Sequence, residues 1–198
     1  MNKLNNIVVY CGSNWGENPA FFAAAQALGQ TLANNGHTLV YGGGNVGLMG
    51  AVADAVLAHG GKVVGVIPTF LKQKEVAHLG LTELIETADM TSRKNTMIAL
   101  ASGFIALPGG LGTYEELFEV LSQAQLRLHP HPVGVLNVAG FFDPLLALLR
   151  DTVRHGFMPA ANLSLLCVAD SAPALLAKMA AWQAQDAVKW VQPSWKQT

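Results

Sequence analysis

Short runs of consecutive apolar residues alternate along this chain with longer segments whose apolar residues recur at helical spacing. Uninterrupted apolar strands are typical of a parallel sheet covered by helices on both faces, because neither face of such a strand meets water. The pattern therefore predicts one α/β domain over residues 1–198, with a roughly seven-stranded parallel sheet and a tail from about residue 186. The expected strands are residues 7–10, 38–41, 63–67, 83–86, 103–106, 133–138 and 163–168, and the expected helices are residues 18–36, 48–58, 93–100, 117–128, 144–155 and 173–185.

The first expected helix has clear signals at both ends. It begins at Asn18-Pro19, because proline at the first helical position gives up only a backbone N–H that would be unpaired anyway. Gly36 is the expected end. The apolar stripe that should face the sheet consists of Phe22, Ala25, Leu28 and Leu32.

The composition limits the classes of partner. Of the 198 residues, 51% are apolar and 13% are charged, and the mean hydropathy of +0.32 is high for a soluble monomer. We therefore expect a partner chain to cover part of the surface. A net charge of −1 gives no general attraction to nucleic acid or to an anionic membrane, so any phosphate site must be local. Residues 95–114 carry no charge, but glycines and a proline divide them into a helix end, a strand and a turn, which argues against a membrane span.

The beginning of the chain and its cysteines predict the compartment. A single early lysine followed by a four-residue apolar run, 7–10, does not make a secretory signal. Cys11 and Cys167 are only two thiols, far apart in the sequence, so reduced cysteines are expected rather than a disulfide framework. Cys11 adjoins a glycine turn, where packing is the expected role. The protein is therefore expected in the cytoplasm.

A glycine-rich turn and two carboxylates follow the expected strand 103–106. Gly109, Gly110 and Gly112 let the backbone pass close to a bound group, and the helix that opens there favours an anion such as phosphate. Glu115 and Glu116 lie just inside this helix. They are one residue apart, which is about 100° around a helix. One of them should face a cleft, and the spacing does not decide which.

Glu116 also has a purely structural interpretation. Thr113 and Glu116 stand at the spacing of a capping box, in which Glu116 would only return a hydrogen bond to the helix start. From the residues alone, the structural and the functional interpretation are about equally supported.

A second glycine turn, Gly-Gly-Gly-Asn-Val-Gly at 42–47, follows the second expected strand and matches the G-x-G-x-x-G pattern. A nicotinamide dinucleotide site is disfavoured, because that fingerprint normally follows the first strand and the next strand ends at Pro68 rather than at an acidic residue. The glycines could also serve only a tight turn. The preferred interpretation is that Gly43 and Gly44 form a second backbone cradle for the same mononucleotide.

The remaining candidates come from the segments after the third and fourth strands. Arg93 and Lys94 stand near a helix start, where cations are mildly unfavourable, which favours a bound anion there. Glu75 and His78 have no third ligand at a recognisable spacing, so no metal site is expected. Lys94 could in principle carry a pyridoxal Schiff base, but nothing else supports that cofactor. Because parallel strands with right-handed crossovers place these loops on one sheet edge, the candidates should converge there.

Three segments together resemble the LOG family of cytokinin riboside 5′-monophosphate phosphoribohydrolases, which are often labelled lysine decarboxylases. They are Tyr-Gly-Gly-Gly-x-x-Gly-Leu-Met-Gly at 41–50, Met-x-x-Arg-Lys at 90–94 and Pro-Gly-Gly-x-Gly-Thr-x-Glu-Glu at 108–116. The last motif is specific for the superfamily but does not fix the substrate. The resemblance implies a Rossmann-like homodimer without a cofactor. It would hydrolyse the N-glycosidic bond of purine nucleoside 5′-monophosphates (cytokinin-type or adenosine), giving free base and ribose 5-phosphate.

By motif position, the resemblance implies that Arg93 and Glu116 are the catalytic pair and that the glycine turns and Thr113 hold the phosphate. A carboxylate near C1′ could stabilise the positive charge that develops on the ribose and take a proton from water. The alternative is a non-catalytic nucleotide-binding or cofactor-carrier module on the same scaffold. The expected substrate-binding residues are Ser13, Gly43, Gly44, Met49, Arg93, Lys94, Gly109, Gly110, Gly112, Thr113 and Glu115.

Two positions depart from the pattern of this family. Gln123 stands where Trp is usual, and Arg127 stands where Gly is usual. If their helix borders the base pocket or a dimer contact, these residues would bear on base preference or on assembly. The helix also has apolar residues on more than one face, which indicates burial against another chain.

Overall fold

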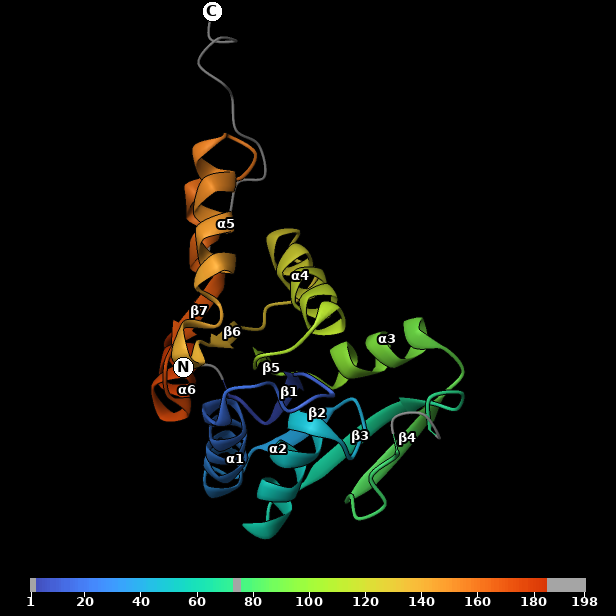
Figure 1. Ribbon diagram of the computed structural model, residues 1–198. Helices are drawn as coiled ribbons and strands as arrows, with labels where there is room; N and C mark the ends of the chain where they lie inside the picture. Colours follow the sequence, from blue (N-terminus) through green and yellow to red (C-terminus); the bar gives the residue numbers. More distant parts are fainter. Residues whose placement is uncertain (1–2, 73–75, 185–198) are drawn as a thin grey trace, which may run out of the picture.

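The computed structural model describes residues 3–72 and 76–184, so Glu75 and the expected tail lie outside the described residues. Seven strands form one sheet in the order β4-β3-β2-β1-β5-β6-β7, and every neighbouring pair is parallel (Figure 1). The predicted α/β fold with a seven-stranded parallel sheet is confirmed. The strands are β1 (Asn6–Tyr10), β2 (Thr38–Tyr41), β3 (Val63–Pro68), β4 (Glu83–Thr87), β5 (Gly103–Ala106), β6 (Val133–Leu136) and β7 (Leu166–Ala169).

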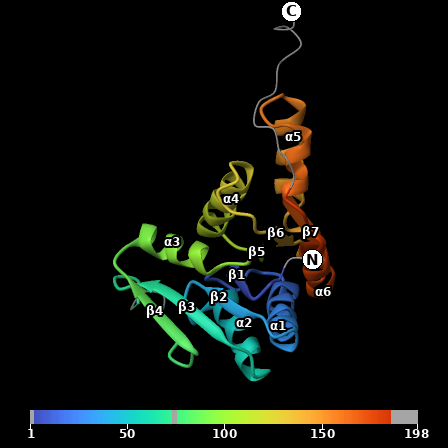
Figure 2. The same cartoon turned by 180° about the vertical axis from the view of Figure 1, so that it is seen from behind.

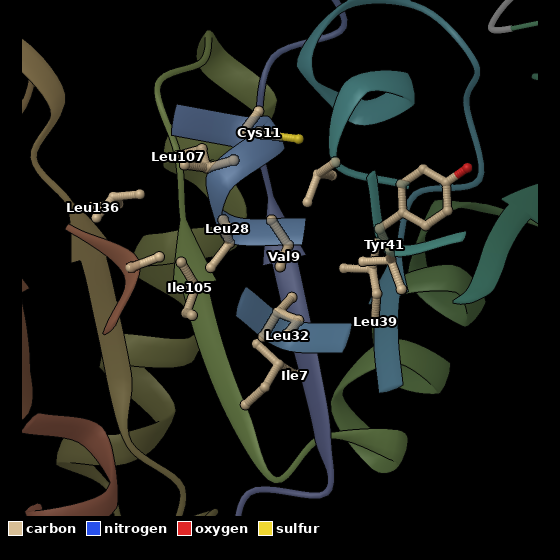
Figure 3. Close-up of a cluster of buried hydrophobic side chains, with 14 of the residues drawn as sticks. Ile7, Val9, Cys11, Leu28, Leu32, Leu39, Tyr41, Ile105, Leu107 and Leu136 are labelled. Atoms are coloured by element: carbon tan, nitrogen blue, oxygen red, sulfur yellow. The ribbon is translucent and has the colours of Figure 1, made fainter. Parts of the chain in front are cut away.

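Six α-helices of the described chain cover the two faces of the sheet (Figure 2). Successive strand residues point to opposite faces, so Ile7 and Val9 join one buried cluster while Val8 and Tyr10 join the other. Figure 3 shows the first cluster, in which Leu28 and Leu32 lie against side chains of β1 and β5. One face carries α1 (Pro19–Asn34), α2 (Gly47–Ala58) and α6 (Ala172–Ala181), and the other carries α3 (Met90–Leu100), α4 (Leu111–Gln125) and α5 (Asp143–Arg154).

The observed elements differ from the sequence expectations mainly at their ends. The expected strand 163–168 begins only at Leu166, because residues Ala160–Leu165 form a 3-10 helix, η2. The expected strand 133–138 ends at Leu136 and is followed by a second 3-10 turn, η1 (Val138–Gly140). The last helix ends at Ala181 instead of 185. At the two strands, apolar residues stay buried where the backbone turns, as Leu165 of η2 and Val138 of η1 do.

The first helix confirms its predicted start but not its whole stripe. Asn18 caps the helix by accepting a hydrogen bond from the N–H of Ala20 at 2.9 Å. Ala25, Leu28 and Leu32 are buried, whereas Phe22 is 38% exposed and packs edge-on against Trp15. Phe22 was wrongly expected to face the sheet. It lies in the first turn of the helix, before the buried stripe begins.

The chain reverses its direction of travel across the sheet between β1 and β5. From β1 it proceeds outward to β2, β3 and β4, and it then returns to place β5 on the other side of β1. Open parallel sheets bind ligands at such a switch point, at the carboxyl ends of the strands. There the N–H of Gly12 donates to the carbonyl of Pro108 at 3.0 Å, so the turns after the two strands touch.

Within the described residues, none of the helices has both the length and the apolar character needed to cross a membrane.

Candidate active site

A cavity of about 530 Å³ opens at the carboxyl edge of the sheet. Its wall is built from the turns after β1 and β5, the first residues of α2, the loop after β3, and one face each of α3 and α4. Most of the predicted site residues meet here, although they come from separate parts of the chain. Those that line the cavity are Ser13, Met49, Arg93, Gly109, Gly110, Gly112, Thr113, Glu115 and Glu116.

The glycines of the turn between β5 and α4 have two different structural roles. Gly109 is packed: a Cβ added there would stand 2.1 Å from the hydroxyl of Thr113 and 2.8 Å from the backbone nitrogen of Gly12. At Gly110 and Gly112 an added Cβ would meet nothing within 4 Å. Because both residues line the cavity, they leave backbone open to an occupant, at the positive end of α4.

Arg93 is held by the ends of two strands. The residue is 6% exposed, and its Nε and Nη2 donate to the carbonyls of Val66 and Gly42, each at 3.1 Å. Gly42 has no side chain for a steric reason, since a Cβ there would lie 1.9 Å from Nη2. These two strand-end carbonyls fix the guanidinium fork at the cavity wall. The sequence predicted Arg93 as an anion site but gave no sign of these anchors.

The adjacent carboxylates of Glu115 and Glu116 on α4 lie in different surroundings. The exposed Glu115 forms an ion pair with Lys94, whose ammonium also lies 3.0 Å from a carboxylate oxygen of Glu119. These hydrogen bonds, that of Glu115 first, raise the pKa of Lys94. Lys94 is not among the residues that line the cavity, although the sequence placed it on the substrate.

Glu116 lies on the side of α4 that faces the end of β1. Its negative charge raises the pKa of the Tyr10 phenol and of the Cys11 thiol, in both cases after burial, which is the larger cause. The capping-box alternative is wrong. The N-cap of α4 is Gly110, without a side-chain capping bond, and Thr113 already lies inside the helix. The helix starts at Leu111, six residues before the expected position, because Gly112 does not interrupt it.

The turn at 42–47 packs against protein rather than opening to the cavity. The carbonyl of Gly43 accepts from the N–H of His78 at 3.0 Å, and Gly44 pairs with Ala77. Neither Gly43 nor Gly44 lines the cavity, so the structure does not bring them to the other predicted site residues. Gly47, with φ of +67°, leaves room for Ser13, because a Cβ on it would lie 2.3 Å from the Ser13 carbonyl carbon. The turn thus supports one wall of the site.

His78 has its own structural partners. Its Nε2 lies 2.9 Å from a carboxylate oxygen of Asp54, and its Nδ1 accepts from the N–H of Gly80 at 3.1 Å. The second bond requires an unprotonated Nδ1, so Nε2–H is the donor to Asp54. His78 therefore ties the loop after β3 to α2.

Comparison with known proteins is consistent with this geometry. A family model described as "Possible lysine decarboxylase" matches residues 49–179. The probable cytokinin riboside 5′-monophosphate phosphoribohydrolase LOGL1 of Oryza sativa subsp. japonica is 46% identical over 89% of this chain and 79% of its own length. The cytokinin riboside 5′-monophosphate phosphoribohydrolase LOG5 of Arabidopsis thaliana is 41% identical over 91% of this chain and 79% of its own. This chain belongs to the LOG family.

Solved structures share the fold of this LOG family member at low identity. The Moco carrier protein from Chlamydomonas reinhardtii is 20% identical with a TM-score of 0.66, covering 88% of this chain and 94% of its own. The molybdenum cofactor binding protein from Rippkaea orientalis is 23% identical with a TM-score of 0.65, covering 89% and 96%. At these identities the likeness shows the fold alone.

An apolar part of the cavity wall was not predicted from the sequence. Trp15 and Phe21 come from the loop after β1 and from α1, whereas Phe141 follows β6. Leu71 and Met90 line the wall near Arg93, and Met90 places its sulfur 3.8 Å from Nη1 of that arginine. None of these residues stands in a glycine motif. Met90 stands in the Met-x-x-Arg-Lys segment, whereas the other residues had only a position in a loop after a strand or near a helix start, which many core residues share.

The two departures from the LOG family pattern lie away from this cavity. Gln123 and Arg127 do not line it. Arg127 has φ of +58° and stands just after α4, where its N–H donates to Ala124 and the N–H of Leu128 donates to Gln123. This is a Schellman helix end, which favours glycine. The geometry explains why glycine suits position 127.

Proposed function

We propose that this LOG family member hydrolyses the N-glycosidic bond of purine nucleoside 5′-monophosphates, of adenosine or of a cytokinin-type nucleoside, releasing free base and ribose 5-phosphate. One observation carries the proposal. The glycine-rich turn at the start of α4, Arg93 and Glu116 line a single cavity at the switch point of the sheet. The names of the curated relatives support the same reaction.

The phosphate would bind at the turn between β5 and α4. Gly110 and Gly112 leave open space beside the backbone at the helix N-terminus, where N–H groups and the helix dipole favour an anion. The hydroxyl of Thr113 and the loop containing Ser13 adjoin this space. Phosphate binding remote from C1′ supplies positioning energy for the reacting bond. A plain nucleoside should therefore be a poor substrate.

The ribose would lie between α3 and α4. Cleavage at C1′ builds positive charge on the sugar, as in other glycoside hydrolyses. The carboxylate of Glu116 would stabilise that charge and take a proton from the attacking water. Arg93, anchored to Val66 and Gly42, presents a fixed cation that would orient the phosphate or ribose and favour the ionised form of Glu116. The base would then rest on the apolar wall beyond Arg93.

The test is free-base release from AMP, GMP, CMP and isopentenyl-AMP, with adenosine as control, followed by chromatography. We expect release from purine monophosphates and little from adenosine, because adenosine lacks the group that the cradle binds. Equal turnover of AMP and adenosine would contradict the phosphate assignment. AMP binding without release from any nucleotide would favour the alternative, a non-catalytic nucleotide-binding or carrier module.

We also propose that the protein works as a homodimer through α4 and α5. Phe118 is 40% exposed beside a cavity of about 140 Å³ between α4, α5 and η2. Asn162 lines that cavity at 5% exposure, and neither polar atom of its amide has a hydrogen-bond partner in the described part of the chain. An unpaired buried amide is costly. Both amide atoms are already shielded from solvent, so a second copy would act here by covering Phe118 and the exposed Leu148 of α5.

Light scattering tests the assembly. The unaltered chain should have the mass of a dimer, and Phe118→Glu should shift it toward monomer. Leu79→Glu, at an exposed residue near the β4 edge, serves as the control and should leave the mass unchanged. A monomeric unaltered chain would contradict the dimer.

We further propose a cytoplasmic location, which the two free cysteines support.

A further inference from the structure

The two proposed catalytic groups stand on different helices. Arg93 is on α3, which packs mainly on β1–β4, and Glu116 is on α4, which packs mainly on β1, β5 and η2. Both helices lie on the same face of the sheet (Figure 1). The distance between the guanidinium and the carboxylate therefore depends on how two separately supported helices are held relative to each other.

Lys94 links these helices directly. Its ammonium contacts the carboxylates of Glu115 and Glu119, which are one turn apart on α4 and face the same way. The Lys94 side chain is largely covered, and that of Glu119 is only partly exposed, so this pair is less open to water than an ordinary surface ion pair. One cation from α3 thus joins two successive turns of α4.

The ion pairs of Lys94 and the orientation of the catalytic groups are connected, because adjacent side chains leave a helix at a fixed angle to each other. Arg93 and Lys94 are adjacent, so their side chains leave α3 about 100° apart. The same angle separates Glu115 from Glu116 on α4. On α3, the side chain of Lys94 points to α4, and that of Arg93 therefore points to the strand ends. On α4, the side chain of Glu115 points to Lys94, and that of Glu116 therefore faces the end of β1. A rotation of either helix that broke the link would misdirect the catalytic group beside it.

We propose that Lys94 is a positioning residue that clamps α3 to α4 through Glu115 and Glu119, and so sets the orientation of Arg93 relative to Glu116. The inference rests on the proposed hydrolase function. It also reassigns Lys94, which the sequence placed on the substrate. The ammonium is occupied by the carboxylates of Glu115 and Glu119, and of these three residues only Glu115 lines the cavity.

The ammonium of Lys94 also affects the electrostatic surroundings of Glu116. Glu116 shares the cavity with Arg93 of α3, its charge adds to burial in raising the pKa of Tyr10 at the end of β1 and of Cys11 just after it, and Glu115 and Glu119 stand beside it on α4. Removing the ammonium would leave three carboxylates close together with one fewer cation. The ionised form of Glu116 would then be less favoured, and the acid limb of the rate profile should move to higher pH.

The experiment measures kcat and KM for AMP, and the pH profile, in Lys94→Ala, Glu119→Gln and Lys94→Arg. We expect Lys94→Ala to lower kcat on the order of ten- to a hundredfold, because small misplacements of reacting groups have effects of that size. KM should change by less than about threefold, since no substrate contact is lost. Glu119→Gln should show a weaker loss of the same kind, and Lys94→Arg should keep most of the activity. Lys62→Ala, at an exposed lysine just before β3, is the matched control.

The outcomes separate this inference from the proposed function. A large rise in KM for AMP in Lys94→Ala, with kcat unchanged and Glu119→Gln unaffected, would show that Lys94 holds the phosphate and would overturn the clamp. Unchanged kinetics in Lys94→Ala would also overturn it while leaving the hydrolase intact. No base release from the unaltered chain would reject the proposed function and this inference together. If Lys94→Ala does not fold, the kinetics and pH profile of Glu119→Gln decide.

Discussion

The protein contains two glycine-rich turns that look alike in sequence but meet different surroundings. At Gly110 and Gly112, after β5, an added Cβ would stand in open space beside the cavity. At Gly42 and Gly47, after β2, it would strike Arg93 or Ser13 at 1.9 and 2.3 Å. The first turn leaves room for a ligand, whereas the second leaves room for other parts of the protein. A glycine pattern therefore shows that something passes close to the backbone, without telling what it is.

The largest expected effect tests the carboxylate that follows the open turn. Glu116→Gln should lower kcat by about 10²–10⁴-fold, the usual contribution of a general base, because the neutral amide cannot take a proton or stabilise the sugar cation. AMP affinity, measured by calorimetry, should be retained, because the phosphate cradle is unchanged. Turnover equal to that of the unaltered chain would remove Glu116 from the mechanism.

The packed turn is tested by Gly42→Ala. The new methyl group would occupy the position of the Arg93 guanidinium, which must then leave the carbonyls of Gly42 and Val66. Loss of these buried bonds should lower the free energy of unfolding by about 1–3 kcal/mol in urea titrations. The displaced guanidinium should lower kcat on the order of tenfold or more. A variant with normal stability and activity would show that the contact at Gly42 is dispensable.

Gly112→Ala is the counterpart in the open turn and should have the opposite sign on stability. Gly112 lies inside α4 with free space beside it, so alanine should raise the free energy of unfolding by about 0.5–1 kcal/mol. The methyl group would intrude on the proposed phosphate site and raise KM for AMP. A destabilised variant with unchanged KM would contradict the distinction between the two turns.

The smallest effect concerns the other end of α4. Arg127 adopts φ of +58° at a helix end that favours glycine. Arg127→Gly should therefore raise the free energy of unfolding by up to about 1 kcal/mol, the usual cost of this conformation for a residue with a side chain. Base release from AMP should stay the same, because Arg127 does not line the cavity. Thermal unfolding of both chains checks the first statement, and the chromatographic assay checks the second.

The sheet could be predicted from the sequence because its strands are short apolar runs that glycine, proline or polar residues interrupt. Runs such as 7–10 carry that signal locally, and parallel pairing follows from the helices between them. The 3-10 helix at Ala160–Leu165 could not be predicted in this way, because its buried Leu165 continues the apolar run of β7 and does not indicate where the backbone turns.

The site was only partly accessible to the same reasoning. Arg93 and the turn at 109–112 could be proposed because a helix start or a glycine cluster has local chemistry. The partners of Lys94 could not, because they lie on another helix and the sequence does not contain the rotation of α3 relative to α4. Gly43 and Gly44 are the opposite case. Their local sequence pattern predicted contact with a ligand, but in the structure they contact other parts of the protein.

The adjacency of β1 and β5 has a consequence for how the protein is made. The backbone N–H of Asn6 donates to the hydroxyl of Ser102, across 96 residues of sequence, and the turns that follow β1 and β5 touch at Gly12 and Pro108. During synthesis the first strand must wait for its second neighbour until β5 has left the ribosome. Nucleotide binding would thus begin only after α4 has been translated, which makes a tagged nucleotide analogue a direct reporter of the moment at which β5 joins β1 in a nascent chain.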